Sequence, residues 1–465
     1  MKQKKTAECY KQGSLFATEV PVWHERSGKV SSVWLSICEE ERNQTRDLMG
    51  RMTHLSNLTK AYRQVRRNGG SSGVDNQSIA EFGVWFKNHY KEFQEELISG
   101  TYVPQPVKGV QIPKPKGGYR QLGIPTVKDR VVQQAINQVL QPIYDPKFSE
   151  SSFGFRPRRG AHDALRRACE IVNSGKSTVV DVDLAKFFDE VNHQRLLWLL
   201  STRIGDKRML SLISRILKTD ILQGGLSNQR IKGTPQGSPL SPLLSNIVLD
   251  ELDQELTRRG LDFVRYADDV QIFVGSQQAA ERVHNSIIGF IENVMLLKVN
   301  REKSGIKPSY KVNFLGHSLL ANGKLGLSKQ SEERLKDKLK EITRRNRGVS
   351  FEQVIQELRS LLQGWMQYFK YASMGRKLKS LDGWLRRRLK CYRLKQCKRV
   401  IGIVRFLTSL GVEKTLSWRT ALSGKGWWRL SNSPAISIGM NNLWFAKQNY
   451  YSLSENYQRQ SRSPL

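Results

Sequence analysis

Four aspartates in two strand-like segments are the residues of this sequence best placed to do chemistry together. Asp181 and Asp183 lie two residues apart in the β-branched run TVVDVD, so their side chains share one face of the expected strand. Asp268 and Asp269 interrupt the apolar run FVRYADDVQIFV, at the expected tip of a tight hairpin. Adjacent strand residues point to opposite faces, so we expect one of this pair to aim at a site on the sheet. If the two strands are neighbours, one carboxylate from each converges on one point.

Such a cluster of carboxylates requires a cation close by, because burying unpaired negative charges would cost several kcal/mol each. The chain has no Cys-x-x-Cys pair and no matching histidine cluster. Oxygen ligands alone favour Mg²⁺, with Mn²⁺ as a substitute ion. A pair of Mg²⁺ ions roughly 3.5–4 Å apart is the arrangement that drives nucleotidyl transfer, in which one ion activates a 3′-hydroxyl and the other stabilises the leaving pyrophosphate.

The overall charge points to a polyanionic partner. The chain has 465 residues with 76 Lys and Arg against 42 Asp and Glu, which gives a net charge of +34. Nucleic acid is the favoured partner, and a membrane surface is not, because no apolar amphipathic anchor and no run of 18 apolar residues is present. The N-terminus lacks the apolar core of a secretory signal. The five cysteines are odd in number and include no Cys-x-x-Cys pair, so neither a zinc site nor a disulfide framework is expected. A reducing intracellular setting is expected.

The elements around the aspartates predict an α+β fold. Residues 110–125 read as two short strands around a Gly-Gly turn, and a helix is expected from Thr126. Residues 233–256 read as a Gly/Pro turn that opens a helix. Basic helices are expected from residue 328, and residues 376–399 hold eleven Lys or Arg against one Asp. The prediction is a small antiparallel sheet with helices, followed by a basic helical third.

An ordered series of motifs resembles the reverse transcriptase–maturases encoded by bacterial group II introns. Across roughly residues 60–320 the matching stretches are IPKPKGGYRQLGIPTVKDRVVQQAI, FGFRPRRGAHDAL, VVDVDLAKFFDEVNH, GTPQGSPLSPLLSNIVLDELD, RYADD, LKVNREKSG and NFLGH. LRSLLQGWMQYFKY and GWLRRRL resemble the thumb, or maturase, domain of the same family. The resemblance implies a right-hand polymerase with fingers, palm and thumb. It divides the chain into an N-terminal extension (1–60), fingers and palm (61–325), a thumb/maturase domain (326–400) and a DNA-binding region (401–465).

The resemblance assigns the catalytic, metal-binding role to Asp183, Asp268 and Asp269. Asp183 fits the first palm motif because an aromatic residue, Phe188, follows five positions later. Asp181 does not fit that spacing, and we expect it to be a solvated or structural carboxylate. Of the adjacent pair, Asp268 is expected to be the more direct ligand and Asp269 closer to a bystander.

The resemblance also implies a nucleotide-binding set. Lys114 and Arg120 would contact the triphosphate, and Phe188 would act as a steric gate that excludes a ribose 2′-hydroxyl. Gln236 would contact template and nucleotide, and Lys303 would lie near the pyrophosphate as a general acid. Each has a plainer interpretation: a solvated basic loop for the cations, a core aromatic, a turn with a helix cap, and a surface lysine.

Basic residues in two further motifs are expected to contact nucleic-acid backbone. They are Arg156, Arg158 and Arg159 in FGFRPRRG, for which an ordinary surface cluster is the alternative, and Arg386, Arg387 and Arg388 in GWLRRRL. The implied partners are a group II intron RNA held in a ribonucleoprotein, a DNA target, a primer–template duplex and deoxynucleotide triphosphates. No membrane partner is expected, and the sequence indicates no oligomeric state.

The expected function is RNA-directed DNA synthesis combined with assistance to intron splicing and retrohoming, in the bacterial cytoplasm near the nucleoid. The chain ends at Leu465 without the paired cysteines and histidines of the family's endonuclease, so we expect priming from another nick or a replication fork. One alternative is a maturase with a vestigial polymerase site, which the intact aspartates, Phe188 and Gln236 disfavour. Another is a defence or diversity-generating reverse transcriptase, which the maturase-like residues 358–390 disfavour.

Overall fold

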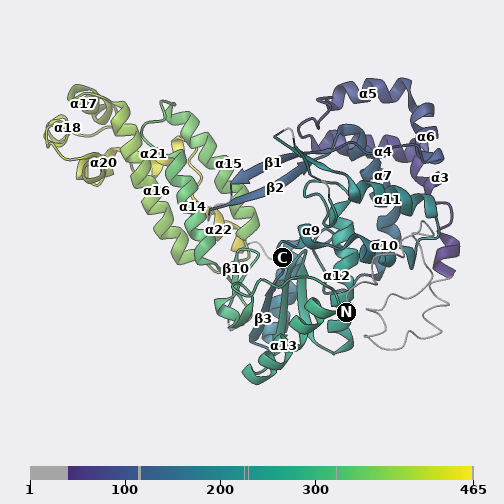
Figure 1. Ribbon diagram of the computed structural model, residues 1–465. Helices are drawn as coiled ribbons and strands as arrows, with labels where there is room; N and C mark the ends of the chain where they lie inside the picture. Colours follow the sequence, from purple (N-terminus) through teal and green to yellow (C-terminus); the bar gives the residue numbers. More distant parts are fainter. Residues whose placement is uncertain (1–39, 114–116, 225, 229, 321, 463–465) are drawn as a thin grey trace, which may run out of the picture. The chain divides into compact units, whose positions relative to one another are not determined.

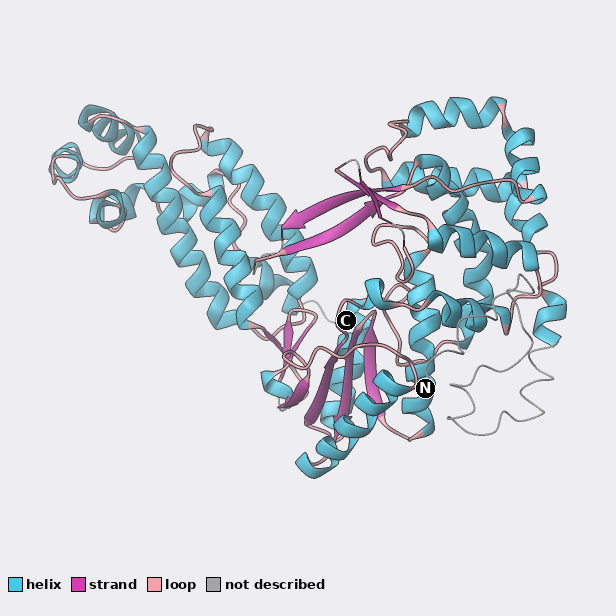
Figure 2. Ribbon diagram, viewed as in Figure 1, coloured by secondary structure: helices cyan, strands magenta, loops and turns pink. Residues whose placement is uncertain are grey.

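The computed structural model describes residues 40–113, 117–224, 226–228, 230–320 and 322–462. The chain divides into two compact units, Met1–Pro308 and Ser309–Leu465. Helices predominate in both units, and the strands form small, largely antiparallel sheets (Figures 1 and 2), which confirms the predicted α+β class. Among these residues, no helix is both long enough and apolar enough to cross a bilayer.

A helical cluster opens the first unit. Its members are α3 (Leu48–Thr53), α4 (Leu55–Asn68), α5 (Ile79–Asn88), α6 (Tyr90–Ser99), α7 (Val127–Tyr144) and the 3-10 turn η1 (Asp145–Lys147). Helix α7 begins where the sequence predicts, because the Thr126 side chain accepts a hydrogen bond from the Asp129 amide. The buried stripe Leu58, Ala61 and Val65 of α4 has helical spacing, and α4 packs on α7.

The predicted hairpin at residues 110–125 forms one side of a four-stranded sheet. The strands run in the order β2–β1–β4–β5, and their bounds are β1 (Val107–Pro113), β2 (Tyr119–Ile124), β4 (Ile221–Gln223) and β5 (Leu226–Asn228). Strand β1 pairs antiparallel with β2 and parallel with β4. Lys114 lies outside the described residues.

A second four-stranded sheet, antiparallel throughout, carries the aspartates. Its order is β6–β7–β3–β8, with β3 (Thr178–Asp183), β6 (Asp262–Tyr266), β7 (Asp269–Val274) and β8 (Gly305–Pro308). The associated helices are α8 (Ala161–Asn173), α9 (Phe187–Glu190), α10 (His193–Ser201), α11 (Lys207–Lys218), α12 (Ser241–Arg258) and α13 (Gln277–Asn293). Helix α13 contacts β3, β7 and β8, while α8 and α12 contact β6.

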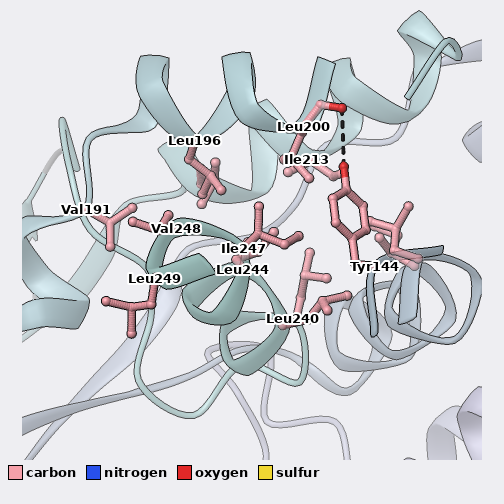
Figure 3. Close-up of a cluster of buried hydrophobic side chains, with 14 of the residues drawn as sticks. Tyr144, Val191, Leu196, Leu200, Ile213, Leu240, Leu244, Ile247, Val248 and Leu249 are labelled. Atoms are coloured by element: carbon pink, nitrogen blue, oxygen red, sulfur yellow. Dashed lines mark hydrogen bonds between the residues drawn. The ribbon is translucent and has the colours of Figure 1, made fainter. Parts of the chain in front are cut away.

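One face of this sheet merges with the core of the first unit. Val180, Val182, Val270 and Ile272 alternate along β3 and β7 and join a continuous buried apolar cluster. Figure 3 shows the part of the cluster where leucine, isoleucine and valine side chains of α12 meet those of α10 and α11, beside the hydrogen bond from the Tyr144 hydroxyl to a backbone carbonyl. Because apolar residues take this face, the polar residues that alternate with them lie on the other.

The second unit is a small sheet followed by helices. Its elements are η2 (Ser309–Lys311), β9 (Asn313–Phe314), β10 (His317–Leu319), β11 (Leu325–Leu327), α14 (Lys329–Ile342), α15 (Phe351–Phe369), α16 (Gly375–Gln396), α17 (Val400–Ser409), α18 (Lys414–Ala421), α19 (Trp427–Leu430), α20 (Pro434–Gly439), α21 (Asn442–Lys447) and α22 (Leu453–Arg462). Phe445 and Leu453 are buried in the same apolar cluster as α14, α15 and α16. The buried carboxylate of Asp382 in α16 accepts hydrogen bonds from Tyr450, Ser452 and Ser454. The end of the chain therefore completes the core of the preceding helices.

Candidate active site

The strand register brings carboxylates from β3 and β7 together. Asp183 lies directly opposite Asp269, and Asp181 lies opposite Gln271. Directly opposed residues of antiparallel strands point to the same face, so Asp181, Asp183 and Asp269 share one face of the sheet. The predicted convergence of one carboxylate from each strand is thus present. The register places Asp269 rather than Asp268 directly opposite Asp183, and the ranking of the two as metal ligands stays a prediction.

Asp268 occupies the turn between β6 and β7. This turn consists of Ala267, with a left-handed φ of 58°, and Asp268. The charge of Asp268 is close enough to Asp269 to raise the pKa of that carboxyl group. Asp268 is therefore at the edge of the acidic site rather than on the paired strands.

The electrostatics of this acidic face centre on Asp269. Burial is the largest cause that raises its pKa, to about 7, and the charges of Asp181, Asp268 and Asp183 raise it further. Lys307 opposes this shift and holds Asp181 at 2.9 Å, while the Lys303 ammonium lies 3.2 Å from Asp183 Oδ2. The structure thus brings Lys303, singled out from the sequence, to Asp183. It adds Lys307, which sequence reasoning missed.

This charge arrangement predicts an unusual pH dependence of stability when divalent cations are absent. The pKa of Asp269 is raised from 3.8 to about 7 in the folded state. The contribution of this residue to the free energy of unfolding is therefore fully present below pH 3.8 and is lost as the pH rises through 7. We expect the free energy of unfolding to fall by up to about 1.4 kcal/mol per pH unit over this window relative to Asp269→Asn. Urea titrations from pH 4 to 8 in a chelator measure this difference. Because burial also raises the pKa of Asp250, to about 6, the comparison with Asp269→Asn isolates the residue. Parallel pH profiles for the two proteins would contradict the prediction.

The acidic face suits a divalent cation chemically. The carboxylates of Asp183 and Asp269 are hard oxygen donors. The pKa of Asp269 is raised by burial and then by the neighbouring carboxylates, and a cation would stabilise the buried charge. Within the described ranges, no group of three or more Asp, Glu, His or Cys side chains is gathered closely enough to hold a metal ion. Lys303 and Lys307 instead occupy carboxylate oxygens of Asp183 and Asp181. A metal ion would have to replace an ammonium group there.

A buried polar network holds the aspartate hairpin. Arg265 of β6 is fully buried and makes a bidentate pair with Asp253 of α12, at 2.8 and 2.5 Å. The same guanidinium donates to Asn246 Oδ1 at 2.9 Å and to the Ala267 carbonyl at 3.0 Å. The network therefore fixes the backbone of the turn that carries Asp268. Sequence reasoning missed it, although an arginine inside the apolar run FVRYADD is a signal that could have found it.

The FGFRPRRG segment packs against this hairpin. The Phe153 amide donates to the Arg265 carbonyl and the Arg265 amide donates to the Ser151 carbonyl, both at 2.9 Å. A Cβ on Gly154 would lie 2.2 Å from the Ala267 nitrogen, so only glycine allows this approach. Its carbonyl accepts from Asn246 at 2.9 Å. The segment therefore braces the turn that carries Asp268.

The three arginines of this segment have different positions. Arg156 is buried, and its guanidinium donates to the Asp145 carboxylate and to several backbone carbonyls. That guanidinium has no face left for a phosphate, which corrects the expected nucleic-acid contact. Arg159 is half-buried and donates to the Glu150 carboxylate and carbonyl. Arg158 is exposed with a φ of 59°, so of the three it alone keeps a position suited to a phosphate.

Two predicted nucleotide-binding residues meet in the first unit. Arg120 Nε donates to Gln236 Oε1 at 2.6 Å, and the Gly123 amide donates to the Gln236 carbonyl at 2.8 Å. Gly237 has a φ of 113°, and a Cβ there would lie 2.5 Å from the Gly123 carbonyl oxygen. The GTPQGSP turn is thereby docked on β2, with an arginine and an amide side by side.

Phe188 and the maturase-like arginines also have defined surroundings. Phe188 is half-buried beside the buried Phe187, and its carbonyl accepts a hydrogen bond from the Thr234 amide at 2.6 Å. The guanidinium carbons of Arg387 and Arg388 lie 4.1 Å and 5.2 Å from tryptophan rings. Both arginines also donate to groups within their own unit. Arg386 has no hydrogen-bonded or ion-paired partner in the part of the chain that the structure describes.

Two protein families match the chain in tandem. Residues 112–319 match the family described as reverse transcriptase (RNA-dependent DNA polymerase), and residues 332–405 match the maturase-specific domain of group II introns. The first match contains every predicted catalytic aspartate. The second contains α15 and the strongly basic α16.

Similar proteins include bacterial relatives and one solved assembly. Protein YkfC of Escherichia coli K12 is 34% identical over 269 residues, which cover 49% of this chain and 70% of YkfC. The group II intron-encoded protein LtrA of Lactococcus lactis is 36% identical over 208 residues, covering 44% of this chain but only 34% of LtrA. A chain in a partial Cas6-RT-Cas1–Cas2 complex is 25% identical with a TM-score of 0.34, covering 53% of this chain and 42% of that one. The acidic face, the reverse transcriptase domain and the adjoining maturase domain together show that this chain belongs to the group II intron reverse transcriptase–maturase family.

Proposed function

We propose that this chain copies RNA into DNA and assists the splicing and retrohoming of the group II intron RNA that it binds. The observation that carries the proposal is the shared face of Asp181, Asp183 and Asp269, with lysines at the two carboxylates of β3. A reverse transcriptase domain spans these residues and a maturase-specific domain follows it. The net charge of +34 suits a protein that holds RNA and DNA together.

Asp183 and Asp269, with Asp268 at the edge, would hold two Mg²⁺ ions. Bound there, the ions supply Lewis-acid activation of a primer 3′-hydroxyl and charge stabilisation for the departing pyrophosphate. Lys303 now neutralises Asp183 at 3.2 Å, so a cation arriving at Asp183 would free its ammonium group. The freed lysine would then lie within reach of the leaving group as a proton donor.

The nucleotide would be held by residues outside the acidic face. Arg120 would bind the triphosphate and Gln236 would contact the base pair, because their hydrogen bond at 2.6 Å places the two side chains together. Phe188, half-buried at the start of α9, would stand under the sugar and exclude a ribose 2′-hydroxyl. Arg158 would contact the nucleic-acid backbone. These roles are those that the family resemblance implies.

The proposed architecture is a right hand. Residues 61–325 would form the fingers and palm, and residues 326–400 the thumb and maturase domain. Residues 1–60 and 401–465 would be the N-terminal extension and the DNA-binding region. Their partners would be the intron RNA, a DNA target, a primer–template duplex and deoxynucleotide triphosphates.

Two assays test this proposal on the full-length protein. A DNA primer annealed to an RNA template should be extended with deoxynucleotides and Mg²⁺, and a chelator or Asp183→Asn should abolish the extension. RNA that copurifies from the source cell should contain a group II intron lariat when sequenced. Extension by Asp183→Asn at the wild-type rate would refute the polymerase role, whereas unselective copurified RNA would refute the maturase role.

A further inference from the structure

A polar pocket in the second unit takes no part in the proposed polymerase chemistry. Its volume is about 330 Å³, which is at the lower end of the range for small-ligand sites, about 300–1,000 Å³. One wall is Arg386, Arg387 and Lys390 of α16, and the facing wall includes Ser431, Asn432 and Asn441 from the segments around α19–α21. Figure 1 shows α20 and α21 close to α16, within the same unit.

The charges of this pocket are all of one sign. Its ionisable lining residues are the three cations of α16, and no Asp or Glu belongs to the lining. Arg387 is held against Trp428, with its guanidinium carbon 4.1 Å from the ring centre and a 2.8 Å hydrogen bond to the Trp428 carbonyl. Arg386 and Lys390, one helical turn apart, have no hydrogen-bond or ion-pair partner among the described residues. Like charges at this spacing destabilise a helix.

The acid that could neutralise Arg386 is already engaged. Asp382 lies one turn earlier on α16, but it is fully buried and its two oxygens accept hydrogen bonds from Tyr450 and from residues 452–454. Burial lowers the pKa of Lys390, and the charge of Arg386 lowers it further. A bound anion would relieve both effects.

The facing wall supplies uncharged hydrogen-bonding groups. Asn441 is exposed and caps α21, because its side-chain oxygen accepts a hydrogen bond from the Trp444 amide at 2.9 Å. Asn432 is also exposed, and Ser431 is held by the Trp428 carbonyl at 2.8 Å. A pocket lined by two unpaired cations and by asparagine and serine side chains suits the oxygens of a phosphodiester and its sugar.

We propose that this pocket binds one phosphate, with its adjoining sugar, of a single-stranded segment of nucleic acid. Arg386 and Lys390 contact the phosphate oxygens, and Arg387 is a structural member of the wall that sets its shape. The inference rests on the proposed function for the class of ligand, which is nucleic acid. A phosphodiester could come from RNA or from DNA, and the experiment distinguishes the two.

Equilibrium binding to labelled oligonucleotides tests the pocket. The probes are a single-stranded RNA and a single-stranded DNA of the same twelve-nucleotide sequence, measured by fluorescence anisotropy against KCl with the full-length protein. Arg386→Gln with Lys390→Gln should weaken binding about tenfold in 0.1 M salt. It should also flatten the plot of log affinity against log salt by about 0.7 per lost contact. The matched control is Lys379→Gln, an exposed lysine of the same helix outside the pocket, which should change affinity less than threefold.

The outcomes separate this proposal from the proposed function. Weaker binding of RNA alone, of DNA alone or of both supports the pocket and names its ligand. Unchanged binding, or an equal loss with Lys379→Gln, would overturn it, because charge at a distance would then account for the effect. An unchanged thermal midpoint of the double variant excludes misfolding as the cause, and single variants replace the double one if it does not fold. Primer extension by the wild-type protein is scored independently, so either idea can fail alone.

Discussion

Asp269→Asn should reduce RNA-templated DNA synthesis about 10³-fold while making the folded protein more stable. Activity falls because the side chain opposite Asp183 loses the charge that would bind a metal ion, which contributes several kcal/mol in such sites. Stability rises, by at least about 1 kcal/mol at pH 8, because a buried carboxyl group whose pKa is raised to about 7 no longer has to ionise among other carboxylates. Initial rates of primer extension and urea titrations measure the two effects on the same preparations.

The neighbouring aspartates serve as matched controls. Asp181→Asn removes a charge from the same face but from a carboxylate that Lys307 holds at 2.9 Å, so we expect less than a tenfold loss of activity. Asp268→Asn tests the ranking within the turn, and we expect a smaller loss than for Asp269→Asn. Retention of more than a tenth of the activity in Asp269→Asn would show that the residue opposite Asp183 is not part of the catalytic set.

Arg265→Met should both destabilise the protein and misplace the catalytic turn. The substitution leaves the fully buried Asp253 carboxylate without its partner, which costs about 3–5 kcal/mol in comparable sites. It also removes the donor to the Ala267 carbonyl, and a shift of the turn by about 1 Å could lower activity about 10²-fold. Denaturant midpoints and primer-extension rates give the two quantities.

A double variant separates the two effects of Arg265. Arg265→Met with Asp253→Leu replaces the ion pair by apolar groups, so stability should return to within about 2 kcal/mol of the wild type. Activity should stay low, because the Ala267 carbonyl still lacks its donor. Recovery of activity together with stability would show that the network is structural only. Arg258→Met, which breaks an exposed pair with Glu255, should change neither quantity measurably.

Local patterns in the sequence predict the elements that carry the site. The β-branched run ending at Asp183, the hairpin around Asp268 and the helix starting at Thr126 all form where their sequences indicate. Each depends on neighbours within a few residues, namely alternation, a tight turn and a capping hydroxyl. The α+β class follows from the same signals.

Long-range pairing explains what the sequence could not predict. The position of Asp269 opposite Asp183 depends on the register between β3 and β7, and these two paired residues are 86 positions apart in the sequence. Arg156 is buried because its guanidinium donates to the Asp145 carboxylate and to backbone carbonyls of a preceding loop. A run of three arginines on α16 likewise reveals nothing of Trp428, which holds Arg387 and leaves Arg386 unpaired.

The way the chain end returns to α16 has a consequence for dissecting the protein by deletion. Removing residues 401–465 would take Phe445 and Leu453 out of an apolar core and strip the Asp382 carboxylate of every hydrogen bond described above. A fragment ending near residue 400 would thus be expected to lose folding rather than a separable recognition module. Point substitutions on the surface of the last helices, not shortened chains, are the way to ask what this segment recognises.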